Sequence, residues 1–266
     1  MNSSVTNAIN LLEELARSKK SLALRDLARK LDLDKATAYR LLNSLWEKGL
    51  VQKIGRHGLY GLGPRLLMLA EEYRRSFTMR DTVAPYLEQL VGTTGETALY
   101  CERFQYDSCV TIDRRESPHH TRTVIETGIP RPLYVGSSAV AILAMLPEEE
   151  VRSILRLRPL VKLTPQTATS PKQVWKKIDQ VRRRGYAVSI QERYSYTAGV
   201  AAPCFLDDRV IGSIAVIGPA ERIKTTGVEK TGKAVRRIAD RLSAELGGYH
   251  NSSGLRSGNK ALRVIK

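Results

Sequence analysis

The sequence predicts an α+β protein of two domains, an N-terminal winged helix-turn-helix and a larger domain in which helices flank a mostly antiparallel sheet. Two patterns indicate this: apolar residues recur at helical spacing over residues 5–47, and strand-like segments alternate with helical ones from residue 98 onward. The 266 residues suffice to bury two separate cores. A composition of 42% hydrophobic and 26% charged residues is typical of a folded globular protein.

Three helices are predicted at the N-terminus. The first has apolar residues at steps of three and four, namely Val5, Ala8, Ile9, Leu12 and Leu15. The second spans residues 22–31, and its apolar face is formed by Leu24, Leu27, Ala28 and Leu31. After a tight turn, Asp34 is the expected N-cap of a third helix, which ends at Gly49 and buries Ala38, Leu41, Leu42 and Leu45. The second and third helices around this turn form a helix-turn-helix.

The outer face of the third helix has the residue types that read DNA. Lys35, Ala36, Tyr39, Arg40 and Asn43 point away from the apolar stripe. Arg can pair with guanine and Asn with adenine, while flanking Lys, Arg and Tyr hold phosphates. The solvated face of an ordinary three-helix bundle would show the same pattern. The DNA contacts expected from the helices are Arg25, Lys35, Thr37, Tyr39, Arg40 and Asn43.

A short β-hairpin is predicted directly after this helix, with strands over residues 50–54 and 59–62. Lys53 lies on the approach to its loop, and Arg56 and His57 lie in the loop. A basic hairpin in this position is a wing that touches the sugar-phosphate backbone, so these three residues complete the expected DNA contacts. The nearby glycines follow the order G-x-x-G-x-G, the reverse of the dinucleotide fingerprint, and no βαβ unit surrounds them, which argues against a nucleotide loop.

The charge of the chain also favours a polyanionic partner. The formal net charge is +16, and the basic surplus is densest in residues 1–80 and in the last 16 residues. A basic surface of this kind suits nucleic acid. A generally basic surface that only keeps the protein soluble would give the same net charge.

The second half of the chain alternates strands and helices. Residues 65–91 are expected to be helical, as a linker followed by an entry helix, and a buried helix is expected at the longest apolar stretch, residues 139–146. The predicted strands cover residues 98–104, 109–113, 121–127, 186–190, 200–206 and 210–216. The buried helix is expected to begin at residue 137 and end at 146, and the further helices cover a segment after Pro147 and residues 171–184 and 230–246.

Several ordered segments resemble the IclR-type transcriptional regulators. They are VTNAINLLEEL from Val5, DKATAYRLLNSLWEKGLV from Asp34, YGLGPRLLMLA from Tyr60, IPRPLY from Ile129, RGYAV from Arg184, AGVAAP from Ala198 and IGSIAVIGPAERI from Ile211. The resemblance covers about residues 5–250. It implies a winged helix-turn-helix over residues 1–63, a linker helix over 64–80 and a GAF-like effector-binding domain over 81–250. The basic segment 251–266 is expected to be disordered.

The resemblance also implies an effector pocket over one face of the sheet. Its carboxylate-binding positions correspond here to Ser137 and Ser138, which open a helix whose N-terminal amides favour an anion. Ser189, Gly199, Ala215 and Ile217 stand on the opposite wall, where the family has larger polar groups. This departure predicts a roomier and more apolar pocket, suited to an aromatic or branched carboxylic acid. A pocket filled by neighbouring side chains would look the same in the sequence.

No enzyme motif is found. His119 and His120, with Asp113 and Glu116, could be proposed as metal ligands, but adjacent histidines in a charged loop more often face solvent and no second cluster completes a site. The cysteines have neither C-x-x-C spacing nor an obvious base. We therefore expect no catalytic residues, no metal and no cofactor.

The sequence thus predicts a sequence-specific DNA-binding regulator, more often a repressor than an activator in this class, whose DNA affinity depends on a small organic acid. Its expected partners are a double-stranded DNA operator, the acid and a second copy, as a homodimer or homotetramer. The alternative is a basic architectural nucleic-acid-binding protein without regulation. No run of about 20 apolar residues occurs, no signal pattern opens the chain and the three cysteines suit a reducing compartment, so a cytoplasmic protein away from membranes is expected.

Overall fold

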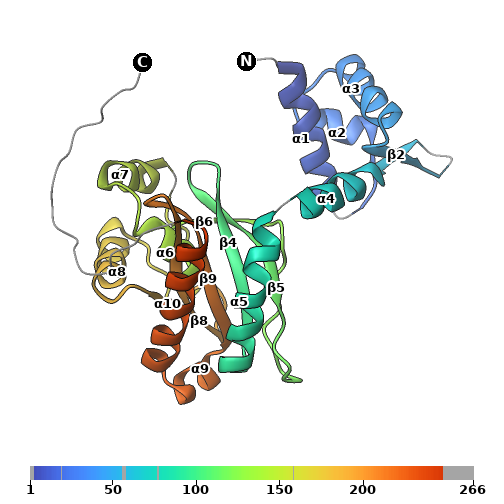
Figure 1. The fold of residues 1–266 in the computed structure, drawn as a ribbon. Helices are drawn as coiled ribbons and strands as arrows, with labels where there is room; N and C mark the ends of the chain where they lie inside the picture. The colour runs from blue at the N-terminus through green and yellow to red at the C-terminus, as the bar shows by residue number, and fades with distance from the viewer. Residues whose placement is uncertain (1–2, 19, 56–57, 77, 158, 248–266) are drawn as a thin grey trace, which may run out of the picture. The chain divides into compact units, whose positions relative to one another are not determined.

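The computed structural model describes residues 3–18, 20–55, 58–76, 78–157 and 159–247 (Figure 1). The chain divides into two compact units, Met1–Thr78 and Met79–Lys266. The predicted tail lies outside the described residues. Among the described helices, none is long and apolar enough to cross a membrane.

The N-terminal unit is a winged helix-turn-helix, as predicted. Its elements are α1 (Ser3–Ser18), β1 (Leu22–Ala23), α2 (Leu24–Lys30), α3 (Lys35–Glu47), β2 (Val51–Ile54), β3 (Leu59–Leu62) and α4 (Arg65–Ser76). The three strands form an antiparallel sheet in the order β1-β3-β2. Its core gathers Leu11, Leu15, Leu27, Leu42 and Tyr60.

Both ends of α3 are fixed by local sequence. The Asp34 carboxylate accepts a hydrogen bond from the backbone N–H of Thr37 at 2.8 Å, which confirms it as the N-cap. At the other end Gly49 has φ +72°, and two backbone bonds close the helix, from Gly49 N–H to Trp46 O (2.8 Å) and from Leu50 N–H to Leu45 O (2.9 Å). This pairing is the Schellman motif, which needs a left-handed residue after the cap.

Two details of the N-terminal prediction are wrong. Val5 and Ile9 are 56% and 50% exposed, and Leu11 is the fully buried residue of α1 instead. The second helix begins at Leu24, because Leu22 and Ala23 are extended and pair with Tyr60 and Leu59 of β3. This pairing satisfies backbone groups along one side of the wing that a longer helix would leave open.

The C-terminal unit has one six-stranded antiparallel sheet in the order β6-β5-β4-β9-β8-β7. The strands are β4 (Thr97–Phe104), β5 (Ser108–Arg115), β6 (Pro130–Pro132), β7 (Ala187–Ile190), β8 (Thr197–Leu206) and β9 (Arg209–Pro219). The helices are α5 (Thr78–Thr94), α6 (Ser137–Leu143), α7 (Glu148–Leu157), α8 (Pro171–Arg184), α9 (Ala220–Thr226) and α10 (Val228–Glu245).

Helices cover both faces of this sheet (Figure 1). Helices α6, α7 and α8 pack on the face that carries Leu99, Ala201 and Ala215. Helices α5, α9 and α10 pack on the opposite face, which carries Val200 and Val216. Adjacent residues of each strand therefore enter different cores, as the two-residue period of a strand requires.

One predicted strand is wrong and one helix was not predicted. Residues 121–127 pair with no strand, and the short β6 takes the edge position beside β5. Thr123 and Ile125 are buried and Val124 is exposed, so successive side chains do alternate between the core and the solvent as in a strand. However, side chains bind the carbonyls of this segment: Thr97 Oγ1 donates to Thr123 O at 2.9 Å, and the Arg114 guanidinium donates to Ile125 O. The helix that was not predicted is α9 (Ala220–Thr226).

Candidate functional site

The exposed face of α3 carries most of the expected DNA contacts. Lys35 and Arg40 are exposed, and Tyr39 is 47% exposed. Arg40 Nη2 donates to Thr37 Oγ1 at 3.2 Å, which directs the guanidinium along the first turns of the helix. Arg25 on α2 is also exposed. The winged domain thus presents cations and the Tyr39 ring on this helix and beside it.

Asn43 differs from the expectation for this face. It is half-buried, and its Oδ1 is buried without a hydrogen-bond partner among the described residues. An unpaired buried amide oxygen is unfavourable by about 1–3 kcal/mol. A side-chain rotation that brings the amide toward a partner would remove this cost.

The wing is joined to α3 by a cation–π contact. The Lys53 ammonium lies 4.2 Å from the ring centre of Trp46. This contact holds strand β2 near the end of the helix. Arg56 and His57, expected at the tip, lie outside the described residues.

An ion-pair cluster, which the sequence analysis missed, fixes α1 to α2. The Glu14 carboxylate is nearly buried and pairs with Lys30 on α2 and with Arg17 at 3.1 Å. The hydrogen bond from Lys30 is the main cause of a lowered pKa of Glu14. The pair joins residues 16 positions apart, which explains why no local pattern revealed it.

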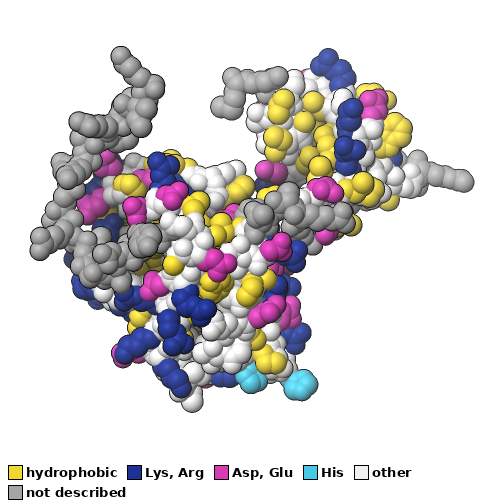
Figure 2. Space-filling model, viewed as in Figure 1, with side chains coloured by type: hydrophobic (Ala, Val, Ile, Leu, Met, Phe, Trp, Pro, Cys, Tyr) yellow, Lys and Arg dark blue, Asp and Glu magenta, His cyan; other side chains and the backbone are white. Residues whose placement is uncertain are grey.

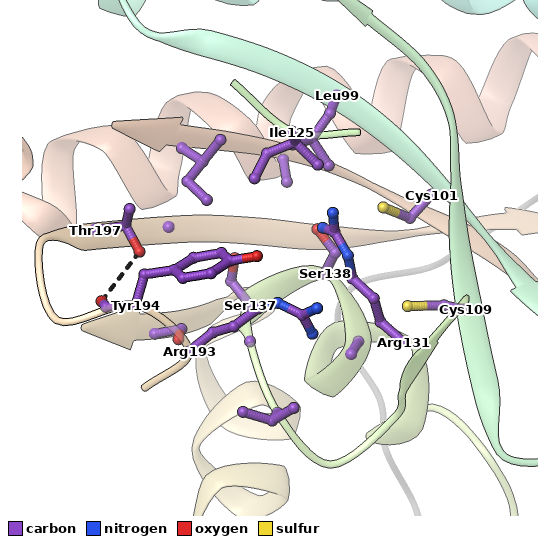
Figure 3. A pocket seen from close by; sticks show the side chains of 17 residues that line it. Leu99, Cys101, Cys109, Ile125, Arg131, Ser137, Ser138, Arg193, Tyr194 and Thr197 are labelled. Atoms are coloured by element: carbon purple, nitrogen blue, oxygen red, sulfur yellow. Dashed lines mark hydrogen bonds between the residues drawn. The ribbon is translucent and has the colours of Figure 1, made fainter. Parts of the chain in front are cut away.

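The six expected effector contacts all line one cavity of the C-terminal unit (Figure 3). Its volume is about 60 Å³. Most of the surface is apolar, as predicted, but the volume does not support a roomy pocket. The lining residues are Leu99, Cys101, Cys109, Ile125, Arg131, Val135, Gly136, Ser137, Ser138, Ala139, Ser189, Arg193, Tyr194, Thr197, Gly199, Ala215 and Ile217.

Small residues allow the walls of this cavity to approach each other. A Cβ on Gly199 would come within 2.6 Å of Ser137 Oγ, so a larger residue at this point of β8 would force the Ser137 hydroxyl to move. Ser213 Oγ on β9 donates to the carbonyl of Ser138 at 3.1 Å and ties the start of α6 to the sheet. Because α6 has only seven residues, its dipole adds little attraction for an anion.

Two arginines that the sequence analysis missed supply the positive charge. Arg131 lies on β6, and Arg193 lies in the loop that leads from β7 to β8. Their guanidinium groups point into the cavity beside Ser137 and Ser138 (Figure 3). Arg131 lies in the segment IPRPLY, which is one of the segments that resemble the family. Nothing in that segment shows where the arginine side chain points.

Two buried thiols line the same cavity. Cys101 and Cys109 are each 2% exposed, and Cys101 Sγ lies 3.4 Å from Thr111 Oγ1. Hydrogen bonding from Cys109 is the main cause that lowers the pKa of Cys101 to about 7, and the same interaction raises the pKa of Cys109. Sequence spacing gave no sign of this pair because the two residues are on neighbouring strands.

No constellation for metal binding is found among the described residues. His119 and His120 are exposed, and the histidine side chains in Figure 2 stand at the molecular surface. A winged helix-turn-helix with a basic recognition helix, followed by a domain with an internal anion-attracting cavity, defines a ligand-responsive DNA-binding regulator.

Comparison with known families agrees with this class. Residues 4–55 match the IclR helix-turn-helix domain, and residues 72–244 match the C-terminal domain of the bacterial transcriptional regulator IclR. The chain belongs to the IclR family of transcriptional regulators.

Named relatives cover nearly the whole chain. The transcriptional repressor IclR of Escherichia coli K12 is 29% identical over 92% of this chain and 90% of its own length. The glycerol operon regulatory protein of Streptomyces griseus is 30% identical over 92% and 96%. These relatives are regulators rather than enzymes, and they do not favour an architectural nucleic-acid-binding role.

Solved structures share the fold. A putative IclR regulator from Silicibacter has a TM-score of 0.79 and 30% identity, covering 92% of this chain and 97% of that one. An IclR homologue from Microbacterium hydrocarbonoxydans, solved in complex with 4-hydroxybenzoate, has a TM-score of 0.75 and 22% identity, covering 92% and 99%. The C-terminal unit is therefore the α/β domain of this family.

Proposed function

We propose that this regulator represses transcription from a DNA operator and that a small carboxylic acid in the cavity of the C-terminal unit changes its DNA affinity. The observation that supports this most strongly is the cavity itself, in which the expected effector positions and two cations come together. Mostly apolar walls with guanidinium groups suit a carboxylate with an apolar frame, and the cavity volume of about 60 Å³ favours a small one. The relative bound to 4-hydroxybenzoate has the same fold. A protein that binds chromosomal operators acts in the cytoplasm.

The proposed DNA contacts are those of the recognition helix and its neighbours. Arg40 and Lys35 enter the major groove from α3, Tyr39 and Thr37 flank them, and Asn43 reaches a base only after rotating outward. Arg25 and Lys53 contact phosphates, together with Arg56 and His57 of the wing. Exposure of Lys35, Arg40 and Arg25 supports this assignment.

The proposed assembly is a homodimer or homotetramer that places two recognition helices in major grooves about 34 Å apart, or a multiple of this distance. Exposed apolar side chains on α4 support self-association, because Leu67, Met68 and Leu69 are 66%, 65% and 51% exposed. We expect Leu67→Glu to lower the mass measured by light scattering, whereas the exposed Glu72→Gln is the control. An unchanged mass in Leu67→Glu would move the interface elsewhere.

The proposed domains are a winged helix-turn-helix over residues 1–63, a linker over 64–80 and the effector domain over 81–250. The regulator has two arrangements, and the effector binds one of them more tightly. The free-energy difference between the arrangements changes by no more than the effector's difference in binding free energy, typically about 1–3 kcal/mol.

The experiment has two stages. A thermal-shift screen of aliphatic and aromatic acids, including 4-hydroxybenzoate, identifies an acid that raises the melting temperature saturably. Duplex DNA selected by the protein from a random library is then titrated by fluorescence anisotropy with and without that acid. We expect a shifted Kd, which Ser138→Trp abolishes by filling the cavity. Persistent acid binding in Ser138→Trp would contradict the assignment of the site.

A further inference from the structure

The two cavity arginines come from opposite edges of the sheet. β6, which carries Arg131, is one edge strand, and β7, which leads into the loop of Arg193, is the other. Cys109 is the register partner of Arg131, so both side chains leave the same face of the sheet. Figure 3 shows the two guanidinium groups on the same side of the cavity, close to Ser137 and Ser138.

No carboxylate of the cavity lining pairs with these cations. None of the residues around the cavity is an aspartate or a glutamate. The Nε atoms of Arg131 and Arg193 are buried and have no hydrogen-bond partner among the described residues. Arg131 donates a long bond of 3.5 Å to the backbone oxygen of Glu126, and the Arg193 guanidinium lies 5.5 Å from the ring centre of Tyr194.

The two charges also act on each other. Burial, and after it the positive charge of Arg193, lower the pKa of Arg131. Like charges that are held together away from water repel more strongly than they do at the surface. A bound anion offsets this repulsion, and a second negative charge on the same ligand allows each guanidinium to face its own carboxylate.

We propose that the ligand of this cavity is a small dicarboxylate with an apolar frame, in which Arg131 and Arg193 each bind one carboxylate. This inference rests on the proposed function, in which the cavity is the effector site. Leu99, Ile125 and Val135 surround the apolar frame, and the cavity volume of about 60 Å³ keeps the frame small. The bound dianion connects the two edges of the sheet, which gives it a direct effect on the shape of the domain.

Calorimetric titration with matched acids tests whether the cavity prefers a ligand with two carboxylates over one with a single carboxylate. Phthalate is compared with benzoate, and succinate with butyrate, so that each pair differs by one carboxylate. We expect the better-fitting dicarboxylate to bind at least about tenfold tighter than its monocarboxylate, the gain typical of one added charged hydrogen bond.

Charge-removing variants locate the effect. Arg131→Gln and Arg193→Gln are each expected to bring the affinity for the dicarboxylate down to about that for its monocarboxylate. The affinity for benzoate or butyrate should change less. Arg131→Lys and Arg193→Lys keep the charge and should keep most of the preference, which guards against a variant that merely fails to fold. Arg209→Gln removes an exposed charge outside the cavity and is the matched control.

The outcomes separate this inference from the function on which it rests. Equal affinity for both members of each pair, or a preference that neither glutamine variant reduces, overturns the dicarboxylate assignment but leaves a monocarboxylate effector in place. If no acid of either pair or of the wider screen binds, the effector cavity itself is wrong. A preference lost equally in Arg209→Gln would place the dianion outside the cavity and overturn the inference as well.

Discussion

Glu102, on β4, is a carboxylate without an ion pair among the described residues, in a half-buried position. Burial is the main cause that raises its pKa to about 7, from an ordinary value of 4.5. At a pH between 4.5 and 7, the Glu102 carboxyl is protonated in the native state but ionised in the unfolded chain. The free energy of unfolding therefore falls as the pH rises from 4.5 to 7, and above pH 7 the full destabilisation is present.

We predict that Glu102→Gln raises the free energy of unfolding at pH 8 by about 1–2 kcal/mol, an amount reduced for the partial exposure of the carboxylate. The gain should be much smaller at pH 5, where the native carboxyl is protonated in the parent. Urea unfolding at both values measures it. A gain that is equal at both pH values would assign the effect to packing rather than to ionisation.

Arg40 provides a second test at the scale of one residue. We predict that Arg40→Ala weakens binding to the selected operator by about 1–3 kcal/mol and relaxes the base preference at one position, provided that the guanidinium reads a base. Anisotropy titrations against the operator and against unrelated duplex measure both effects. An equal loss on the two DNAs would reassign Arg40 to a phosphate.

At the scale of elements, the segment that follows α3 packs closely against the segment that follows the wing strand β3, backbone against backbone. Gly63 donates its N–H to Leu50 O at 2.8 Å, and a Cβ on Gly63 would lie 2.1 Å from the carbonyl oxygen of Gly49. No rotamer can relieve a clash with backbone. The wing strand β3 must therefore move if any side chain is introduced here.

We predict that Gly63→Ala destabilises the N-terminal unit by about 2–4 kcal/mol. Gly58→Ala is the matched control, since its Cβ would meet nothing within 4 Å and only its φ of +65° opposes the change, at about 1 kcal/mol. Hydrogen exchange of the α3 amides, read by mass spectrometry, measures both variants. Similar protection in the two would show that the contact relaxes freely.

Sequence prediction succeeded where the determinant was local and failed where it was not. Asp34 and Gly49 set the ends of α3 through bonds to residues three positions away, so their patterns were decisive. Residues 121–127 alternate like a strand, but a buried threonine hydroxyl and an arginine from β4 and β5 take their carbonyls. Alternating burial alone cannot distinguish a strand from an extended segment that is held by side chains.

At the scale of the whole molecule, each unit has its own core and its own tryptophan. The chain has two tryptophans: Trp46 ends α3 beside Lys53, and Trp175 packs on the core of the C-terminal unit, with the Arg152 guanidinium 5.5 Å from its ring centre. Single-tryptophan variants therefore report on the units separately.

We predict that a saturating acid raises the urea midpoint seen in Trp46→Phe, which reports Trp175, and leaves the midpoint seen in Trp175→Phe nearly unchanged. At a ligand concentration of about 100 times Kd the gain is about 2.7 kcal/mol, because the acid binds only the folded C-terminal unit. An equal shift in both variants would show that the two units unfold together.

The cavity shows the same limit of sequence reasoning at larger scale. Ser137, Ser138, Ser189, Gly199, Ala215 and Ile217 were predicted through matching segments, and the fold brings them together. The arginines were missed because Arg131 and Arg193 meet only when opposite edges of the sheet approach each other. How closely the two edges approach depends on the curvature of the whole sheet, and this curvature cannot be predicted from any single segment.

The alternation of faces along β8 and β9 gives this domain a useful modularity. Ala201 and Ala215 belong to the core on the cavity side, whereas their neighbours Val200 and Val216 belong to the core beneath α10. Of the first set, Ala215 lines the cavity, so exchanging it alters the shape of the cavity while Val200 and Val216 keep the sheet packed against α10. The cavity side of the sheet can thus be changed without altering the core on the other face, which makes the domain a practical starting point for an engineered biosensor.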